Sequence, residues 1–543
     1  MSDNKSQECL PKVALDFIDA VVKKVRYRKK IRQEVREELT DHFYMALKDC
    51  VTDEGKQQVA EEVIEEFGDV KILASLIRRG KKRCRSLWMK TVVATMEVIG
   101  VLLLLVVLRV SYLAIGTPVI SVDYVVWLND FVRQGRDESL NANPYFEKAV
   151  VLSDIEAPES LKGILDERGA INGENIDDVR AYVAKMDPAF AALRQGAAKL
   201  YYWPVYQVGE NEITSSMGLL SGLLDKRMPA LSGIKKLAIR MGDLGVALKL
   251  YDGDIDGAIS DSLVLLRLGQ HMEGTGLLIE QLVGIAVAGK GYAHIIQIID
   301  TENVSAELLL RCQKQLESFS EGRNLLVDFS SEKVFQLDYI QRTFTDDGTG
   351  GGRALLKGLP LAVKDFDDIV RGFVTGNYPD RRKAVASVES YFAESKRFVS
   401  IAPWQTKTEE SDALTAKMTV DVNMQMKPIV QSFLQIRELS WRVMASHRSL
   451  IAVCGVLRYE KDKGEFPSDL QDVVKAGYIK GVPVDPYSGR PFVYKRTDGN
   501  FLLYSYGLDL DDDGASPYIN PNGGKQRTWG RGDGDAVFWP VIR

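Results

Sequence analysis

The feature that most constrains this chain is one long apolar run, from Thr91 to Gly116. A helix rises about 1.5 Å per residue, so a helical run of this length can cross a hydrocarbon layer of roughly 30 Å. Glu97 and Arg109 interrupt the run, and both side chains can reach toward the lipid headgroups. The sequence therefore predicts one transmembrane helix over 91–116, and the alternative is a buried helix of a soluble domain.

Charge is distributed unevenly on the two sides of this run. Residues 1–90 carry 20 Lys and Arg against 16 Asp and Glu, a net charge of +4, whereas the rest of the chain carries 50 against 59, a net charge of −9. A basic cluster from Arg78 to Arg85, with Lys90, directly precedes the apolar run. Because basic flanks of a membrane helix stay on the cytoplasmic side, we expect the N-terminus inside and the C-terminal bulk outside.

Length and composition limit the classes of protein further. At 543 residues the chain is too long for one ordinary core, so several domains are expected. The formal net charge of −5 includes no overall basic excess, so no nucleic-acid partner is expected. Membrane lipid and protein partners on both sides of the membrane are the expected contacts. Cys312 and Cys454 fall on the oxidising side and could pair, although nothing in the sequence requires it.

Residues before the basic cluster read as three or four short helices. Apolar residues recur at helical spacing from Ile31 to Leu47, and a second helical stretch from Val59 ends at Gly68. The succession EELxDHFxxAL … AEEVIEEFGDVKILASLI resembles the HAAS-type helical module, which precedes transmembrane segments in bacterial membrane and signalling proteins. The resemblance implies that residues 1–90 form a cytoplasmic interaction or regulatory module rather than a catalytic one.

The region after the apolar run is mostly helical in pattern. Chain-breaking residues cluster at Asn141–Tyr145 and at Asp346–Gly352, and the second cluster predicts a loop. Leu244–Ile259 looks like the turn of one tetratricopeptide-type helical hairpin, but no second copy follows at a period of about 34 residues. A large extracytoplasmic helical domain over 117–441 is the prediction.

The end of the chain contains a candidate metal site. Asp509, Asp511 and Asp513 alternate along the chain and a glycine follows the third, which is how a loop arranges oxygen atoms around Ca²⁺. Asp533 and Asp535 form a second acidic pair. The position that holds glutamate in an EF-hand is Asn520, so this is not an EF-hand. The alternative is a solvated acidic turn.

Several motifs surround these aspartates in a recognisable order. The patterns Y…G.FP..L, DP..G.PF.Y, YSYG.D and GD..FW follow one another between Tyr459 and Trp539, and they resemble the C-terminal part of type II secretion major pseudopilins. In that family the acidic loop holds calcium, and Asp509 and Asp535 occupy the matching positions. The resemblance implies a small α+β module over 442–543. A pseudopilin has its cleavage glycine where this chain has Val92, so we expect a head domain and not a filament subunit.

Motifs of known enzymes are weak. Gly284 to Lys290 is one residue short of a phosphate-binding loop, because Gly291 stands where Ser or Thr would bind Mg²⁺. Tyr201–Pro204 could line a ligand groove, although such aromatic residues are more often part of a core or an interface. The histidines are too scattered for zinc spacing. They are His42, His271, His294 and His447.

The residues and both resemblances together predict a multidomain, mainly α-helical protein of the bacterial inner membrane. Its expected parts are a cytoplasmic helical module (1–90), a transmembrane helix (91–116), a helical extracytoplasmic domain (117–441) and a pseudopilin-like calcium-binding module (442–543). We expect a single-pass, secretion- or envelope-related scaffold or interaction protein, not an enzyme. The alternative is an extracytoplasmic hydrolase with its site in the central helical domain.

Overall fold

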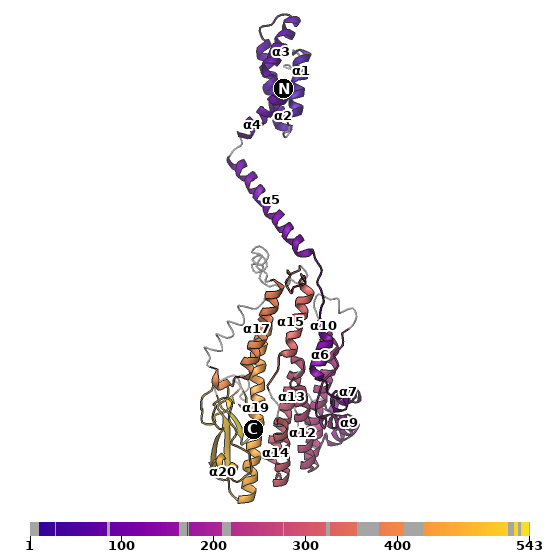
Figure 1. The fold of residues 1–543 in the computed structure, drawn as a ribbon, viewed down its shortest axis with the longest axis vertical. Coiled ribbons are helices and arrows are strands. Elements are labelled where there is room, and N and C mark those ends of the chain that lie inside the picture. The colour runs from indigo at the N-terminus through magenta and orange to yellow at the C-terminus, as the bar shows by residue number, and fades with distance from the viewer. Residues whose placement is uncertain are drawn as a thin grey trace. The chain divides into compact units, whose positions relative to one another are not determined.

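A computed structural model shows a mainly helical protein with a small antiparallel sheet near its C-terminus, which confirms the mainly α prediction (Figure 1). The chain divides into two compact units, Met1–Arg109 and Val110–Arg543. The structure describes residues 10–25, 27, 29–83, 87–161, 171, 173–208, 219–274, 276–321, 326–355, 380–406, 427–519, 526–529 and 534–541.

The first unit contains four short helices followed by most of a long one. They are α1 (Lys12–Lys24), α2 (Lys29–Leu47), α3 (Asp53–Phe67), α4 (Val70–Arg83) and α5 (Leu87–Ala114). Apolar faces of α1 to α4 meet in one core, where the rings of Phe17, Phe43 and Phe67 lie about 6 Å apart. Gly68 ends α3 with a φ of 70°, a left-handed conformation that glycine adopts without strain.

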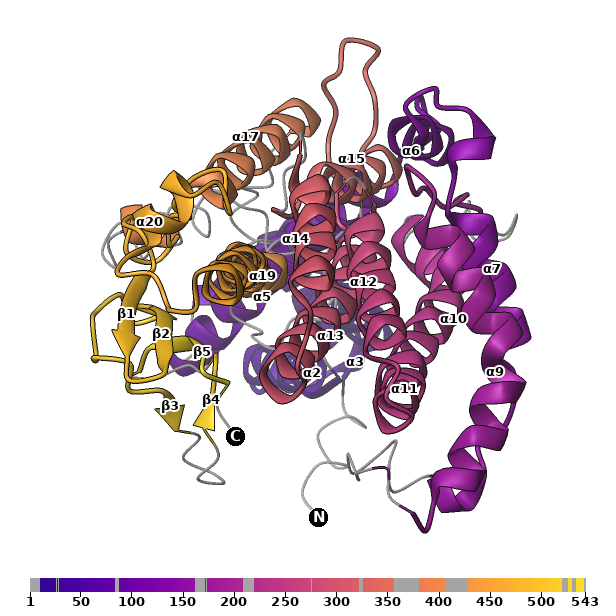
Figure 2. The same cartoon turned by 90° about the horizontal axis from the view of Figure 1, so that it is seen from below.

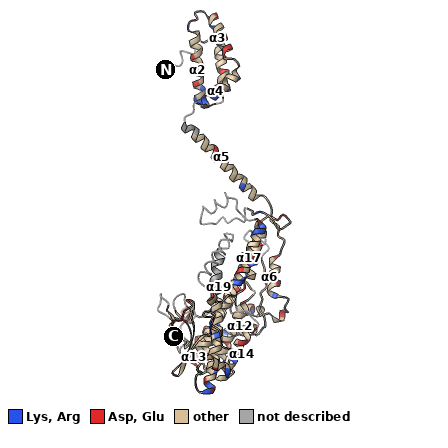
Figure 3. Cartoon of the chain, turned by 60° about the vertical axis from the view of Figure 1, so that its left-hand side comes forward, with Lys and Arg blue, Asp and Glu red and all other residues tan. Residues whose placement is uncertain are grey.

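The apolar run is helical, and most of the described side chains of α5 are exposed. The segment Thr91–Ala114 has a mean hydropathy of 2.6, and none of its most apolar stretch is buried. Figure 3 shows α5 almost entirely without charged residues. A second helix, Leu278–Thr301, is also long and apolar enough to span a membrane, but half of it is buried among other helices. The second helix therefore has the environment of a core helix, which α5 lacks.

The second unit begins with a series of helices whose described residues pack into three hydrophobic cores. They are α6 (Tyr124–Arg133), η1 (Glu138–Leu140), α7 (Asn143–Leu152), η2 (Glu159–Leu161), α9 (Ile176–Ala197), α10 (Leu219–Arg240), the π-helical turn η3 (Met241–Val246), α11 (Ala247–Tyr251), α12 (Ile255–Met272), α13 (Leu278–Thr301), α14 (Ala306–Ser320) and α15 (Ser330–Thr343). The predicted hairpin turn lies between α11 and α12, and the predicted loop follows α15.

Helices α12 and α13 approach each other unusually closely because glycines face the contact. A Cβ atom built on Gly284 would lie 2.6 Å from the carbonyl oxygen of Gly269, and one on Gly291 would lie 2.9 Å from the carbonyl oxygen of Ser262. Gly284 and Gly291 of the near-match to a phosphate-binding loop therefore serve helix packing, whereas a Cβ atom on Gly289 would meet nothing within 4 Å. Lys290 of the same segment forms an ion pair with Asp243, at 2.8 Å.

The last part of the chain joins a long helix to a sheet. Its elements are α17 (Arg381–Ser400), η5 (Pro403–Gln405), α19 (Lys427–Lys463), α20 (Leu470–Lys475), β1 (Val493–Thr497), β2 (Asn500–Ser505), β3 (Tyr518–Ile519), β4 (Gln526–Arg527) and β5 (Ala536–Trp539). The strands β1, β2 and β5 form one antiparallel sheet in that order, and β3 pairs with β4.

Helix α19 packs against the other helices and also against the sheet. Figure 2 shows the strands on one side of α19, with α13 and α14 on its other side. One hydrophobic core contains Ile295 of α13, Leu450 of α19 and Phe501 of β2. The helix passes residue 442, where the sequence places the start of the C-terminal module, without interruption. The module and the central helices therefore share a core.

Candidate functional site

The acidic loop after β2 brings three of the predicted ligands together. Carboxylate oxygens of Asp509, Asp511 and Asp513 all lie within 4.8 Å of one another. Two oxygens bound to one Ca²⁺ at about 2.4 Å can be no more than about 5 Å apart, so the spacing fits one ion. The loop turns tightly, because Leu510 and Ala515 both have positive φ values, of 69° and 72°. Such conformations are uncommon for residues other than glycine.

A fourth predicted ligand, Asp535, lies beside this cluster and is fully buried. Its side chain is 0% exposed, and its Oδ2 accepts a hydrogen bond from the Ala515 N–H at 2.6 Å. Within the described part of the chain, its Oδ1 has no hydrogen-bond partner. Burial, and then the carboxylates of Asp512 and Asp513, raise the pKa of Asp535 to about 6.

The same environment affects Asp509. Its Oδ2 accepts a hydrogen bond from the Gly534 N–H at 2.6 Å, which joins the first acidic segment to the last. Burial, and then the carboxylates of Asp511 and Asp513, raise the pKa of Asp509 above its usual value. Asp533, the remaining predicted ligand, lies outside the described residues. The described donors are all carboxylate oxygens, the ligand type that Ca²⁺ prefers.

A buried aspartate outside the predicted set holds the loop in place. Asp485, of the DP..G motif, is 1% exposed and accepts hydrogen bonds from the Ser505 hydroxyl at 2.7 Å and from the Tyr487 N–H at 3.0 Å. Ser505 ends β2, directly before the acidic loop. The Tyr504 hydroxyl also donates to Asp512 Oδ1 at 2.8 Å. The motif residues therefore fix where the acidic loop leaves the sheet.

A second candidate site is a polar cleft of about 1060 Å³ between α9, α12 and α14. Three arginines line it. The Arg194 guanidinium is held by Asp261 through hydrogen bonds of 2.8 and 2.9 Å. Arg136 lies 4.1 Å above the Tyr201 ring, and Arg267 lies 5.3 Å from the Phe319 ring. Tyr201 and Tyr202 line this cleft, as the sequence allowed, whereas Trp203 is buried in a core.

Two polar side chains of the cleft are largely buried. Gln270 is 5% exposed, and the Tyr292 hydroxyl is a hydrogen-bond partner of its side chain. Both carboxyl oxygens of Glu273 are buried, and neither has a hydrogen-bond partner among the described residues. Burial raises the pKa of Glu273 to about 8. The sequence signal for these buried polar residues is their position, because they follow soon after the mainly apolar stretch that ends at Leu268.

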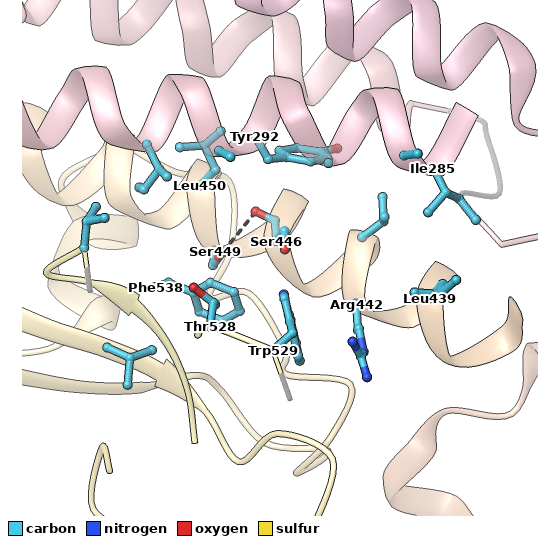
Figure 4. Close-up of a pocket in the computed structure, with 17 residues that line it drawn as sticks. Ile285, Tyr292, Leu439, Arg442, Ser446, Ser449, Leu450, Thr528, Trp529 and Phe538 are labelled. Carbon is cyan, nitrogen blue, oxygen red and sulfur yellow. Dashed lines mark hydrogen bonds between the residues drawn. The ribbon is translucent and has the colours of Figure 1, made fainter. Parts of the chain in front are cut away.

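A third feature is an apolar cavity of about 370 Å³ between α13, α19 and the C-terminal strands. In Figure 4, Tyr292 and Ile285 form one wall, Leu439 lies on α19, and Trp529 closes the opposite side. The Tyr292 hydroxyl is within 2.9 Å of His447 Nδ1. Burial lowers the pKa of His447 to about 4, so this imidazole is neutral at pH 7.

Comparison of the chain with protein families, with curated proteins and with solved structures finds no match.

Proposed function

We propose that this chain is a single-pass protein of the bacterial cytoplasmic membrane whose extracytoplasmic part is a scaffold or interaction domain with a calcium-stabilised, pseudopilin-like end. The observation that carries the proposal is the acidic cluster. Three carboxylates within 4.8 Å of one another repel each other, and Asp535 adds a buried oxygen without a described partner. A cation would relieve both costs.

The donor set favours calcium over other metals. Asp509, Asp511, Asp513 and Asp535 offer oxygen atoms only, whereas structural zinc sites use cysteine and histidine. The bound ion would offset part of the negative charge of the loop and connect the loop to the start of β5, where Asp535 lies. Its role would be structural, since it would hold the end of the chain against the sheet.

Thermal melting of the full chain in detergent, with calcium or with chelator, tests this role. Binding to the folded form alone should raise the melting temperature roughly with the logarithm of calcium concentration. Asp509→Asn and Asp535→Asn should each weaken the response. Asp498→Asn, in the exposed turn between β1 and β2, is the matched control and should leave it intact. Identical melting of the wild type in calcium and in chelator would return the loop to a solvated turn.

The anchoring part of the proposal is supported by the uncovered side chains of α5. Leu102, Leu105 and Leu108 are each more than half exposed, and an apolar surface of this length is unfavourable in water. A lipid environment would remove the cost. The basic residues before Thr91 favour a cytoplasmic N-terminus.

Labelling of cysteines in intact cells tests the orientation. Cys9, Cys50 and Cys84 all precede the apolar run, so a membrane-impermeant maleimide should label them only after the cells are permeabilised. Labelling of Cys84 in sealed cells would show that the orientation is the reverse. The calcium experiment does not depend on this outcome, because it uses purified protein.

A further inference from the structure

Helix α13 carries small residues on two faces that pack in different ways. Gly284 and Gly291 lie against the backbone of α12, where an added Cβ atom would have no room. On another face of the same helix, Ala286, Gly289 and Ala293 line the apolar cavity between α13, α19 and the C-terminal strands. A Cβ atom on Gly289 would meet nothing within 4 Å. The small residues of this face therefore leave open space beside α19.

This cavity is long. Its lining on α13 runs from Ile285 to Ile296, and its lining on α19 runs from Leu439 to Leu450. Each stretch rises roughly 16 Å along its helix, at about 1.5 Å per residue. Figure 4 shows Ile285 and Leu439 at one end of the cavity and Leu450 toward the other. An occupant that fills the cavity must therefore be extended.

The volume of the cavity sets the size of that occupant. At roughly 30 Å³ per atom, the volume that one molecule takes in liquid water, 370 Å³ holds about twelve non-hydrogen atoms. An unbranched chain of about twelve atoms, extended at about 1.2 Å per bond, spans roughly 13 Å. A compact ring system of the same volume is too short to reach both ends. Volume and length thus agree on one unbranched chain.

The chemistry of the lining fits such a chain. Apolar side chains make up most of it, including Trp529, Phe538 and Val541 from the end of the protein. An apolar wall with a few polar groups is the usual composition of a small-molecule site. The polar members here are Arg442, Ser446, Ser449 and Thr528.

Arg442 determines which polar group the occupant carries. Its guanidinium lies at the end of the cavity where Leu439 lies (Figure 4). Glu438 forms an ion pair with it, so the cavity does not favour an anion. Its Nε is buried and has no hydrogen-bond acceptor among the described residues. The Ser446 side chain, one helical turn further along α19, lines the same cavity and can donate or accept. A neutral hydroxyl group at this end would serve both.

We propose that this cavity binds an unbranched aliphatic alcohol of about twelve non-hydrogen atoms, with its hydroxyl group against Arg442 and Ser446. The alkyl chain passes Gly289 and ends near Leu450 and Phe538. None of the lining residues belongs to α5 or is an acidic residue of the candidate calcium site. The proposal therefore does not depend on the membrane anchor or on calcium.

Photolabelling of the purified full chain in lipid nanodiscs tests the proposal at a fixed calcium concentration and pH. The probe is dodecanol with a diazirine near the methyl end of its chain. Peptide mapping should find labels on α19 around Leu450 and on β5 around Phe538. An excess of unlabelled dodecanol should reduce these labels about tenfold or more. Absence of label from both segments, or label that unlabelled dodecanol leaves unchanged, would overturn the proposal.

Two competitors separate the shape of the ligand from its charge. Cyclododecanol has the same number of carbon atoms closed into a ring, so it cannot extend along the cavity. Dodecanoate has an extended chain but places a negative charge beside Glu438, in an apolar site. At equal concentration in the bilayer, each should compete about tenfold more weakly than dodecanol. Equal competition by cyclododecanol would refute the extended chain, and equal competition by dodecanoate would refute the neutral head group.

Variants locate the site and separate binding from folding. Gly289→Leu places a side chain in the open space of the cavity, so it should fold and lose the label. Gln297→Leu, an exposed position of the same helix outside the cavity lining, is the matched control and should keep the label. Circular dichroism checks that both variants are folded. Equal labelling of the wild type and folded Gly289→Leu would place the ligand elsewhere and refute the assignment.

A further variant tests the position of the hydroxyl group. Arg442→Lys keeps a positive charge beside Glu438 but removes the Nε–H. It should weaken competition by dodecanol about two- to tenfold, the effect of one lost hydrogen bond. Unchanged competition would show that the hydroxyl group does not lie against Arg442.

Discussion

Replacement of Gly284 by alanine should destabilise the protein relative to the same replacement at Gly289, although both glycines lie in α13. A Cβ atom on Gly284 would lie 2.6 Å from the Gly269 carbonyl oxygen, which belongs to the backbone of α12. A Cβ atom on Gly289 would meet no other atom within 4 Å. An ordinary contact needs about 3.4 Å or more, so only Gly284→Ala forces the two helices apart.

The size of the difference follows from two terms. Alanine is favoured over glycine within a helix by about 1 kcal/mol, and this gain applies at both positions. Extra volume in a tightly packed contact costs about 1–3 kcal/mol, and this cost applies only at Gly284. Gly289→Ala should therefore be more stable than the wild type by up to about 1 kcal/mol. Gly284→Ala should be less stable than Gly289→Ala by about 1–3 kcal/mol.

Thermal melting of the two variants side by side measures this difference. Circular dichroism should be recorded on the full chain under identical detergent, calcium and pH conditions. Gly291→Ala, whose Cβ would meet the Ser262 carbonyl oxygen at 2.9 Å, provides a second clash position in the same helix and should behave like Gly284→Ala. If Gly284→Ala melts at or above the temperature of Gly289→Ala, the close approach of α12 and α13 is not what these glycines serve.

Two further predictions concern buried groups. Burial raises the pKa of Glu273 from 4.5 to about 8, so the folded chain retains a proton that the unfolded chain releases. The contribution of this proton to the free energy of unfolding is fully present below about pH 4.5. It falls by about 1.4 kcal/mol per pH unit between about pH 4.5 and 8, and it is lost above about pH 8. Melting as a function of pH should show this loss, and Glu273→Gln should reduce the slope; an unchanged slope would contradict the burial of this carboxyl. A hydrogen bond with Cys312, and then burial, raise the pKa of the Cys454 thiol. Both thiols are buried and should resist iodoacetamide in the folded protein but react after unfolding in guanidinium, as counted by peptide mapping; alkylation of either thiol in the folded protein would show that α14 and α19 do not bury them.

Local patterns predicted the helices well, because each depends on a few neighbouring residues. Helical spacing from Ile31 to Leu47 placed both ends of α2 within about two residues, and the glycine after Phe67 placed the C-terminal end of α3. The predicted start of the second helix, Val59, was wrong, because α3 already begins at Asp53. The aromatic run after Asn500 is β2. The alternation of Asp509, Asp511 and Asp513 indicated a cluster, and their oxygens do converge.

Features that depend on residues far apart in the chain could not be predicted from local sequence patterns. The cleft combines Arg136, Arg267 and Phe319, which come from separate helices or loops, and no spacing along the chain links them. Lys290 resembled the lysine of a nucleotide-binding loop when only its neighbours in the sequence were considered. Its actual ion-pair partner, Asp243, lies 47 residues earlier in the chain, so local sequence does not indicate the pair. Burial of Glu273 likewise results from packing around the end of α12, which the charge of the residue alone does not predict.

The continuity of α19 has a mechanical consequence. Its 37 residues form a single rod of roughly 55 Å that carries the sheet at one end and packs against α13 and α14 along its length. A hinge between the acidic loop and the helical layers would have to bend this rod or separate a shared core. A partner that pulls on the acidic loop would therefore load the whole unit Val110–Arg543 rather than swing a tethered head.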